Sequence, residues 1–397
     1  NVIIIMQRVK SSKHRRCDIF FKLYSKIYSA RRFFIIPVFF FSSFYLSVFL
    51  QAMMKSIFQI KTEADFQQKC LETFQFQYEN IEVYRKFIDF LKIDPNSIKE
   101  IEKIPFLPIE MFKNHTVLDQ NKRTNLYFQS SGTTQMNLSK HWIADEKVYE
   151  ESIEKSFEQF IGNPKDFIFL GLLPSYLEKQ NSSLIYMVDF LMKKSGKPEN
   201  GYFLYNHEDL LKLLQQLSKE NKKVILFGVA FALLDFLDFA ESNHHRIESS
   251  DQLIIIETGG MKGRKEEMTK DELLKIFHKG FGTEKIYSEY SMTELLSQAY
   301  SLGKNIYESP NWMRILIRNT EDPFSYVEDG KNGAINIIDL ANRHSCSFIA
   351  TQDLGKIVTD CGISRNEKKD DHIVTKLFQV LGRIDHSDIR GCSLLVS

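Results

Sequence analysis

Apolar runs of strand length alternate with amphipathic stretches through most of the chain beyond residue 125. The runs that we expect to form strands span 167–173, 202–205, 223–228, 253–257, 285–287, 333–338 and 347–350. The stretches that we expect to form helices span 146–160, 182–193, 207–219 and 269–277. Buried strands separated by short amphipathic helices indicate an α/β domain with a largely parallel or mixed sheet. In such folds ligands gather in loops at the carboxyl ends of the strands.

The chain ahead of this alternation is predicted to be a helix followed by extended chain. Residues 63–91 place apolar side chains such as Phe66 and Phe74 among many charges, as an amphipathic helix does. Residues 104–109 include two prolines, and each proline disfavours helix in the residue before it. We therefore expect residues 104–109 to enter the main domain as extended chain.

The first 53 residues follow a different pattern, basic at first and then uncharged. Lysines and arginines recur up to Arg32, and residues 33–50 carry no charge and are just long enough for a membrane anchor or signal segment. Met53 and Met54 stand directly after this run, so residues 1–53 can also be read-through from a mis-called start. We favour the start-site artefact, and we expect a membrane partner only if residues 33–50 are genuine.

Composition excludes several classes of function. The 52 basic and 51 acidic residues leave a net charge of +1, so no basic field argues for a nucleic-acid partner. The five cysteines include no C-x-x-C pair, so neither a disulfide framework nor a zinc site follows from their spacing. A reducing compartment is the simpler inference, and we expect a cytoplasmic protein.

Short polar turns after the predicted strands could hold a nucleotide. The Ser-Ser-Gly-Thr-Thr turn at 130–134 offers hydroxyl and backbone N–H groups to phosphate oxygens, although it lacks the spacing of a Walker loop. Gly259 and Gly260 end a strand and would let a flat ring approach the sheet edge. Residues 287–294 combine two carboxylates with two tyrosines, which suits nucleotide stacking and Mg²⁺ ligation. Each turn alone is explained equally well as ordinary loop chemistry.

The ordered set of motifs is more specific than any one of them. Ser-Ser-Gly-Thr-Thr at 130–134 is followed by Tyr-Ser-Met-Thr-Glu at 290–294, Gln-Asp-Leu-Gly at 352–355 and Gly-Arg-Ile-Asp at 382–385. This series resembles the adenylate-forming superfamily, whose members use ATP to convert a carboxylate to acyl-AMP. Within it the chain looks most like the acyl-protein synthetase (LuxE-type) family. Further likeness lies at 104–108, 258–264 and 390–392, and the resemblance covers about 56–397.

The resemblance implies a fold and a domain organisation. We expect an α/β fold like the N-terminal domain of adenylate-forming enzymes, with mixed β-sheets and flanking helices, over residues 54–381. Residues 382–397 would form a short C-terminal segment. Only fifteen residues follow Gly382, so we expect the full C-terminal lid domain to be lacking and lid-driven transfer to CoA to be hard to accommodate.

The resemblance also implies roles for single residues. Those that would hold ATP are Ser131, Gly132, Thr133 and Thr134 at the phosphates, Gly259, Gly260 and Tyr290 at the adenine, Asp353 at the ribose, and Arg383 near the ribose or a phosphate. Thr293 would touch the α-phosphate, and Glu294 would ligate Mg²⁺. Such donors and a cation suit a reaction in which negative charge accumulates on phosphate oxygens. One departure is Gln135, which replaces the superfamily's glycine, and Lys140 lies two places later than the lysine of the family pattern.

Cys392 is the expected acyl acceptor. Acyl-protein synthetases pass the activated acyl group to a cysteine close to the C-terminus, and Cys392 stands at the matching place. Neighbouring Arg390 and nearby Arg383 would lower a thiol pKa of about 8.5 and favour the nucleophilic thiolate. Without the family context, a small buried cysteine would be the simpler interpretation.

These observations predict an ATP- and Mg²⁺-dependent ligase. It would activate a long-chain fatty or other hydrophobic carboxylate to acyl-AMP, form a thioester on Cys392 and pass the acyl group to a partner protein such as an acyl-reductase. A carboxylate–CoA ligase or a biosynthetic acyltransferase is the close alternative. A catalytically degenerate binding or scaffold protein is the alternative of another class, and the presence of Glu294, Asp353 and Arg383 argues against it.

Overall fold

The computed structural model describes residues 56–130, 138–174, 181–245, 247, 250–259, 268–359 and 375–384. All of them belong to one compact unit, Ser56–Ser397. Residues 1–53, with their basic and uncharged stretches, lie outside the described residues. Among these residues, no helix has the length and apolar character needed to cross a membrane. The expected domain boundaries stay predictions.

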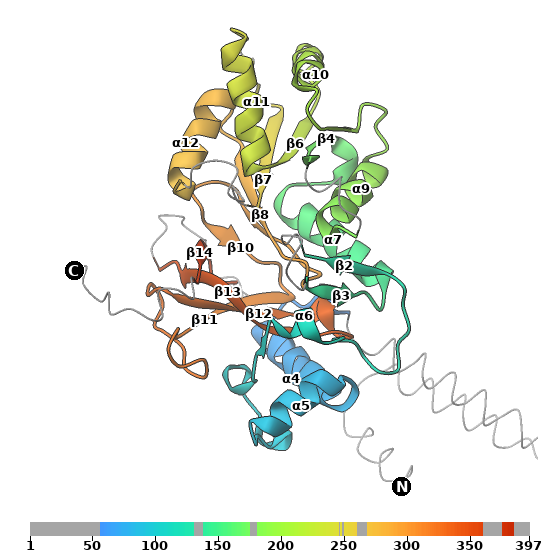
Figure 1. The fold of residues 1–397 in the computed structure, drawn as a ribbon, viewed down its shortest axis with the longest axis vertical. Coiled ribbons are helices and arrows are strands. Elements are labelled where there is room, and N and C mark those ends of the chain that lie inside the picture. The colour runs from blue at the N-terminus through green and yellow to red at the C-terminus, as the bar shows by residue number, and fades with distance from the viewer. Residues whose placement is uncertain are drawn as a thin grey trace, which may run out of the picture. The chain divides into compact units, whose positions relative to one another are not determined.

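A large mixed sheet forms the centre of this unit (Figure 1). Within the described residues it has twelve strands, and β1 (Leu107–Pro108) pairs in parallel with one of them, β13. The other strands, in hydrogen-bonded order, are β11 (Met313–Arg318), β12 (Gly333–Asp339), β13 (Phe348–Ile357), β14 (Phe378–Arg383), β10 (Tyr307–Glu308), β9 (Ala299–Ser301), β8 (Ile286–Tyr290), β7 (Leu253–Thr258), β6 (Val224–Val229), β4 (Ile168–Leu172) and β5 (Gly201–Phe203). The predicted α/β fold with a mixed sheet is confirmed.

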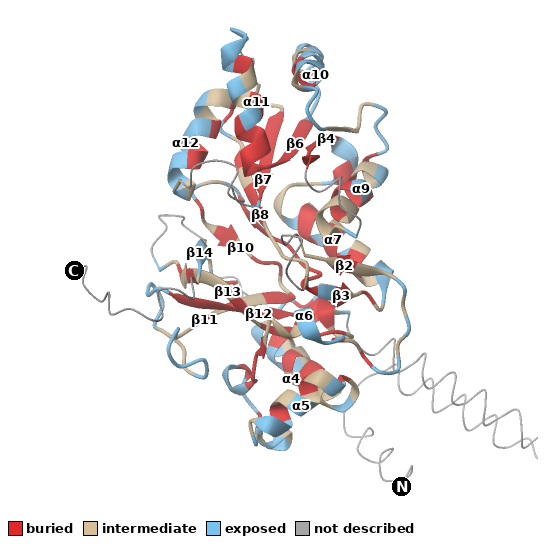
Figure 2. Cartoon of the chain, in the orientation of Figure 1, coloured by how far each residue is buried: buried red, intermediate tan, exposed pale blue. Residues whose placement is uncertain are grey.

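The strands β5, β4, β6, β7 and β8 run parallel. Every residue of β4, β6 and β7 is buried, so this half of the sheet needs cover on both faces (Figure 2). Helix α9 (Ser183–Ser195) packs on β4, whereas α11 (Ala230–Ser242) packs on β6 and β7, and α12 (Lys270–Phe281) packs on β8. From β4 to β5 the chain moves toward one edge of the sheet, and from β6 through β7 to β8 it moves away from that edge. Because crossovers between parallel strands are right-handed, α9 lies on the face of the sheet opposite α11 and α12.

The antiparallel half of the sheet carries helices formed early in the chain. Helix α4 (Glu63–Asn80) is tied to it because the Gln77 amide donates to the Asn342 carbonyl at 3.0 Å and accepts from the Ser347 N–H at 3.1 Å. The single helix predicted over 63–91 is wrong: Ile81 takes an extended conformation between α4 and α5 (Glu82–Phe90). The Ile81 side chain is fully buried, so its packing favours this break.

The other described elements connect these layers. The remaining longer helices are α7 (Glu146–Phe160) and α10 (His207–Lys219), and the short ones are α6 (Met111–Asn114), η1 (Ile57–Gln59), η2 (Pro95–Ser97), η3 (Ile101–Lys103), η4 (Pro164–Asp166) and η5 (Leu340–Asn342). A separate two-stranded hairpin pairs β2 (Tyr127–Gln129) with β3 (Lys140–Trp142). The predicted helices over 146–160 and 207–219 coincide with α7 and α10.

Candidate active site

The predicted phosphate loop is the connection of the β2–β3 hairpin. Two serines close its base: the Ser130 N–H donates to the Ser139 carbonyl at 3.1 Å, and the Ser139 N–H donates to the Ser130 hydroxyl at 3.0 Å. Lys140 follows at once, with its ammonium 5.4 Å from the centre of the Tyr127 ring on the same hairpin. The loop residues Ser131, Gly132, Thr133 and Thr134 lie outside the described residues, so their phosphate-binding roles stay predictions.

Three residues of the predicted nucleotide site meet at the junction of the two halves of the sheet. Tyr290 ends β8, Asp353 lies in β13 and Arg383 ends β14. The Tyr290 hydroxyl donates to Asp353 Oδ2 at 2.8 Å, and Arg383 Nε lies 3.5 Å from Asp353 Oδ1. Asp353 and Arg383 are also direct partners in the antiparallel register of β13 and β14. The structure therefore brings together residues that are far apart in the chain.

Burial and charge act against each other at Asp353. Burial raises the pKa of Asp353 above its ordinary value, although the hydrogen bond from Tyr290 and the charge of Arg383 both favour the carboxylate. The Arg383 side chain is 83% exposed, so one face of its guanidinium is open to a ligand. A carboxylate beside an exposed cation can accept hydrogen bonds from ribose hydroxyls while the cation meets a phosphate.

An aromatic group orients Tyr290. The rings of Tyr307 and Phe378 each lie edge-on to Tyr290 with centroids 5.9 Å away, and they stack on one another at 5.5 Å. Gly259 follows β7 with a left-handed φ of 68°, a conformation that favours glycine. Gly259 therefore directly follows the strand next to β8 without a side chain, and its place near the adenine stays a prediction. Gly260 lies outside the described residues.

The loop after β8 carries Thr293 and Glu294. Glu294 is only 4% exposed, and this burial raises its pKa, whereas a hydrogen bond with the Ser139 side chain lowers it. Its backbone carbonyl accepts from the Asn342 amide at 2.7 Å. Through Ser139, Glu294 is therefore joined to the base of the predicted phosphate loop.

His141 is a site residue that the sequence analysis missed. Its Nδ1 lies 2.9 Å from the Thr293 carbonyl, and its Nε2 lies 2.9 Å from Asn342 Oδ1. The ring is fully buried, and burial lowers its pKa to about 4, so it is neutral at pH 7. A neutral imidazole has a single N–H and can donate to only one of these two oxygens. His141 therefore connects the β2–β3 hairpin to the loop that carries Thr293 and Glu294.

Asp339, also missed, anchors the same loop from the other side. Its carboxylate accepts from the Leu296 N–H at 2.8 Å, the Ser297 N–H at 3.0 Å and the Ser297 hydroxyl at 2.6 Å. Asp339 is fully buried, and these donors stabilise its charge against the burial that raises its pKa. The loop that carries Glu294 is thus fixed by groups from β3, β12 and η5.

Glu294 suits a magnesium site that is completed by phosphate oxygens and water, and does not suit a metal site made of protein side chains alone. In the part of the chain that the structure describes, no group of three or more His, Cys, Asp and Glu side chains could hold a metal. Mg²⁺ in nucleotide sites takes one or two carboxylates together with phosphate oxygens and water. A cation at Glu294 would favour the carboxylate that burial disfavours, so the residue fits this role.

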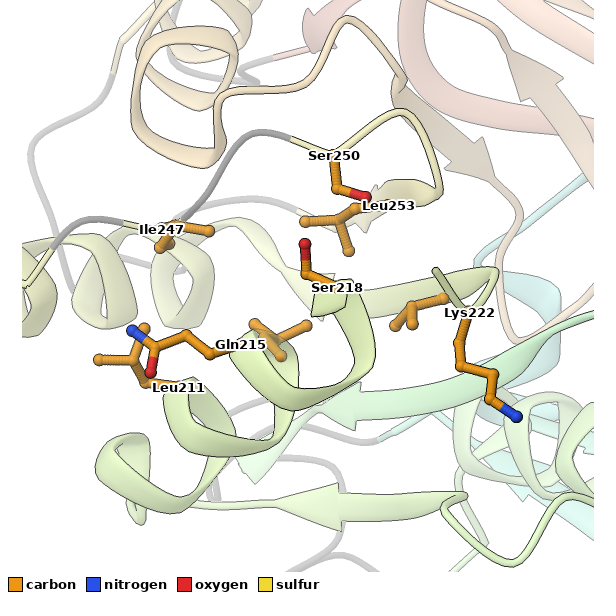
Figure 3. A pocket seen from close by; sticks show the side chains of 9 residues that line it. Leu211, Gln215, Ser218, Lys222, Ile247, Ser250 and Leu253 are labelled. Carbon is orange, nitrogen blue, oxygen red and sulfur yellow. The ribbon is translucent and has the colours of Figure 1, made fainter. Parts of the chain in front are cut away.

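Two hollows in the described residues lie outside the group of Tyr290, Asp353 and Arg383. One, of about 10 Å³, lies between α10 and the segment before β7, and Figure 3 shows Leu211, Ser218 and Leu253 around it. It borders the first residue of both β6 and β7, at the edge of the sheet opposite the carboxyl ends. The other, of about 220 Å³, is lined in part by His141 and Asn342. Neither hollow includes Tyr290, Asp353 or Arg383.

A family model described as "Acyl-protein synthetase, LuxE" matches residues 58–397. A search of the curated proteins found no match.

Solved structures of adenylate-forming enzymes share the fold. The open conformation of 2-hydroxyisobutyryl-CoA ligase in complex with 2-HIB-AMP and CoA matches at TM-score 0.59 and 13% identity, over 82% of this chain and 72% of that chain. The thioesterification state of the same ligase matches at TM-score 0.56 and 12% identity, over 82% and 68%. ATP-bound MatB from Rhodopseudomonas palustris matches at TM-score 0.45 and 14% identity, over 65% and 47%. At these identities the first two likenesses establish the fold alone.

Proposed function

The chain belongs to the acyl-protein synthetase, LuxE family, and from this membership and the site we propose that it activates a long-chain fatty or other hydrophobic carboxylate and transfers the acyl group to Cys392. As a member of this family it is an ATP-dependent ligase that forms acyl-adenylates. The contact between Tyr290 and Asp353 carries the proposal, because it joins two of the nucleotide motifs in one place.

In the first step, an oxygen of the substrate carboxylate attacks the α-phosphorus of ATP. A P–O bond forms, the bond to the β-phosphate oxygen breaks, and pyrophosphate leaves with the bonding electrons. Asp353 holds the ribose, Arg383 lies near the ribose or a phosphate, and the hydroxyl of Thr293 faces the α-phosphate. Glu294 would hold Mg²⁺, and the ion would supply positive charge where negative charge accumulates. Ser131, Gly132, Thr133 and Thr134 bind the departing phosphates.

In the second step, the Cys392 thiolate attacks the carbonyl carbon of acyl-AMP. The C–S bond forms, the C–O bond to the phosphate breaks, and AMP leaves as the anion. A second acyl transfer then delivers the group to an acceptor protein, for which an acyl-reductase is suitable because a thioester is at the right oxidation level for reduction to an aldehyde. Cys392 lies outside the described residues, so this step rests on the family resemblance.

Labelled fatty acid tests the transfer step. After incubation with ATP and Mg²⁺, the wild-type chain should carry label that survives denaturing gels and is released by neutral hydroxylamine, as a thioester is. Cys392→Ser should lose this label but keep carboxylate-dependent pyrophosphate exchange, and Cys346→Ser is the matched control. Hydroxylamine-sensitive label on Cys392→Ser would refute the assignment.

Transfer to CoA is the second candidate, favoured by the fold likeness to a structure that contains CoA. It predicts formation of acyl-CoA when CoA is added, with Cys392→Ser fully active. Measurement of the acyl product with and without CoA separates the two acceptors.

A further inference from the structure

Three buried polar residues form a row across adjacent strands of the sheet. Thr258 in β7 is the register partner of Glu289 in β8, and Glu289 is the register partner of Tyr300 in β9. Register partners project from the same face of a sheet, so these side chains are neighbours. The Thr258 hydroxyl donates to Glu289 Oε2 at 2.6 Å. The row lies at the carboxyl ends of β7 and β8, where parallel sheets bind ligands.

Two atoms of this row lack a hydrogen-bond partner among the described residues. They are Glu289 Oε1 and the Tyr300 hydroxyl, in side chains that are 4% and 1% exposed. A buried polar atom without a partner is costly, and native proteins keep few of them. Because the two atoms belong to directly paired residues, one bound polar group can satisfy both.

The surroundings of the row are aromatic and adjoin the predicted phosphate loop. Tyr149 of α7 lies close enough for the charge of Glu289 to raise its pKa, in addition to the larger effect of burial. The Tyr149 ring stacks on Tyr186 of α9 at 5.4 Å, and Phe128 lies 5.4 Å from Tyr149. Phe128 belongs to β2, which leads directly into the loop. The row is therefore the polar part of an otherwise aromatic region beside the site.

The chemistry of Glu289 favours a hydrogen-bond donor. Burial raises the pKa of Glu289, and hydrogen bonds with Ser291 and Thr258 and the charge of Lys270 act in the opposite direction. Lys270 itself is paired with Glu257, on the opposite face of β7 from Thr258. A hydroxyl or an amine near Glu289 Oε1 would donate the hydrogen bond that this oxygen lacks, whereas an alkyl chain would leave the oxygen without a partner.

We propose that Thr258, Glu289 and Tyr300 form a polar subsite for the acyl part of the substrate, and that this acyl part carries a hydroxyl or amine that donates to Glu289. The inference rests on the proposed function and refines it: a substituted carboxylic acid is a better substrate than the plain alkanoic acid of the same length. A site built to hydrogen-bond a substrate group discriminates strongly against the analogue that lacks it.

Matched sets of acids test this subsite. Carboxylate-dependent pyrophosphate exchange is measured with unsubstituted alkanoic acids and with their hydroxy and amino counterparts of the same length, substituted at successive positions. For the wild type, the best substituted acid should exceed its unsubstituted counterpart in kcat/KM by about tenfold or more. Glu289→Leu and Tyr300→Phe should each lower this ratio several-fold. Glu289→Gln should keep a preference for hydroxyl but lose a preference for amine, which distinguishes the two donors.

Ser301→Ala is the matched control for Tyr300→Phe. Ser301 is fully buried in the same strand, one position along and so on the opposite face, and its hydroxyl donates to the Gly303 carbonyl at 2.9 Å. Ser301→Ala should leave the ratio of kcat/KM between substituted and unsubstituted acids unchanged. Thermal unfolding of each variant shows whether it folds, and the ratio is compared only among folded variants.

The outcomes separate this inference from the proposed function. Efficient exchange with unsubstituted acids, at a ratio near one or a ratio unaffected by Glu289→Leu and Tyr300→Phe, overturns the polar subsite and leaves acyl-adenylate formation intact. In that case the row holds a structural water. Absence of exchange with every acid overturns both.

Discussion

The Tyr290 hydroxyl and the Asp353 carboxylate, 63 positions apart in the chain, are joined by a hydrogen bond of 2.8 Å. This bond connects the end of β8, in the parallel half of the sheet, to β13 in the antiparallel half. It therefore fixes the two motifs relative to one another before ATP binds. Pre-organised donors and acceptors do not have to be reordered during the reaction.

Tyr290→Phe keeps the aromatic ring and removes this hydrogen bond. Since bonds to charged groups contribute about 1.5–3 kcal/mol, we expect the KM for ATP to rise about tenfold or more. Pyrophosphate exchange at varied ATP measures the change. Tyr78→Phe is the control, because its hydroxyl donates to Asp89 at 2.9 Å on the exposed surface. An unchanged KM in Tyr290→Phe would contradict a role for the pair in nucleotide binding.

Arg383→Ala should separate binding from stability. The side chain is 83% exposed and 3.5 Å from Asp353, so the free energy of unfolding should change by less than about 0.5 kcal/mol. The KM for ATP should nevertheless rise several-fold, because the guanidinium is open to the nucleotide. Urea unfolding and exchange kinetics measure the two quantities. A large loss of stability with unchanged KM would assign Arg383 a structural role.

Ser139→Ala should move the acid limb of the pH–rate profile to higher pH. Burial raises the pKa of Glu294, and the hydrogen bond from Ser139 lowers it. Loss of this hydrogen bond should therefore raise the pKa of Glu294 further. Only the ionised carboxylate holds Mg²⁺ well, and activity should therefore fall at a higher pH than in the wild type. Exchange rates across pH 5–8 provide the profile. Ser156→Ala, a buried serine of α7, should leave the limb in place.

His141 makes stability depend on pH. Its folded pKa of about 4 lies below an unfolded value of about 6.5, so the unfolded state binds the proton first as pH falls. Its contribution to stability is complete above pH 6.5 and is lost as pH falls toward 4. Between pH 7 and pH 5 the loss should be about 2 kcal/mol for this residue.

The comparison with His141→Gln isolates this effect from other titrating groups. Urea unfolding at the two pH values should give a smaller decrease for His141→Gln than for the wild type. The variant should also lower the exchange rate at pH 7, because the Thr293 carbonyl loses its ring partner. Equal decreases in both proteins would show that His141 is not buried as a neutral ring.

The fold could largely be predicted where local pattern and tertiary environment agree. The apolar runs of β4 and β6 and the apolar first four residues of β7 are buried on both faces, and α12 begins with a capping box of Thr269 and Glu272. Helix α11 was missed because the consecutive buried residues Ala230–Leu234 leave no polar face to reveal a period. The break at Ile81 depends on its burial, which no local signal predicts.

Only those site residues that belong to sequence motifs could be predicted. Tyr290, Asp353 and Arg383 stood out because they belong to an ordered series, and the structure brings them together. His141 and Asp339 carry no motif. The partners of His141 lie 152 and 201 positions away, so its role exists only in the folded chain.

Carboxylate-dependent exchange of labelled pyrophosphate into ATP tests the central claim most directly. We predict that the wild-type chain catalyses this exchange with at least one hydrophobic or substituted acid, and only when Mg²⁺ is present. Folded Asp353→Ala and Glu294→Gln variants should be slower by about 100-fold or more, since each removes a group that stabilises charge or positions ATP. No exchange by folded wild-type protein with any carboxylate, or undiminished exchange in both variants, would contradict the assignment of this site.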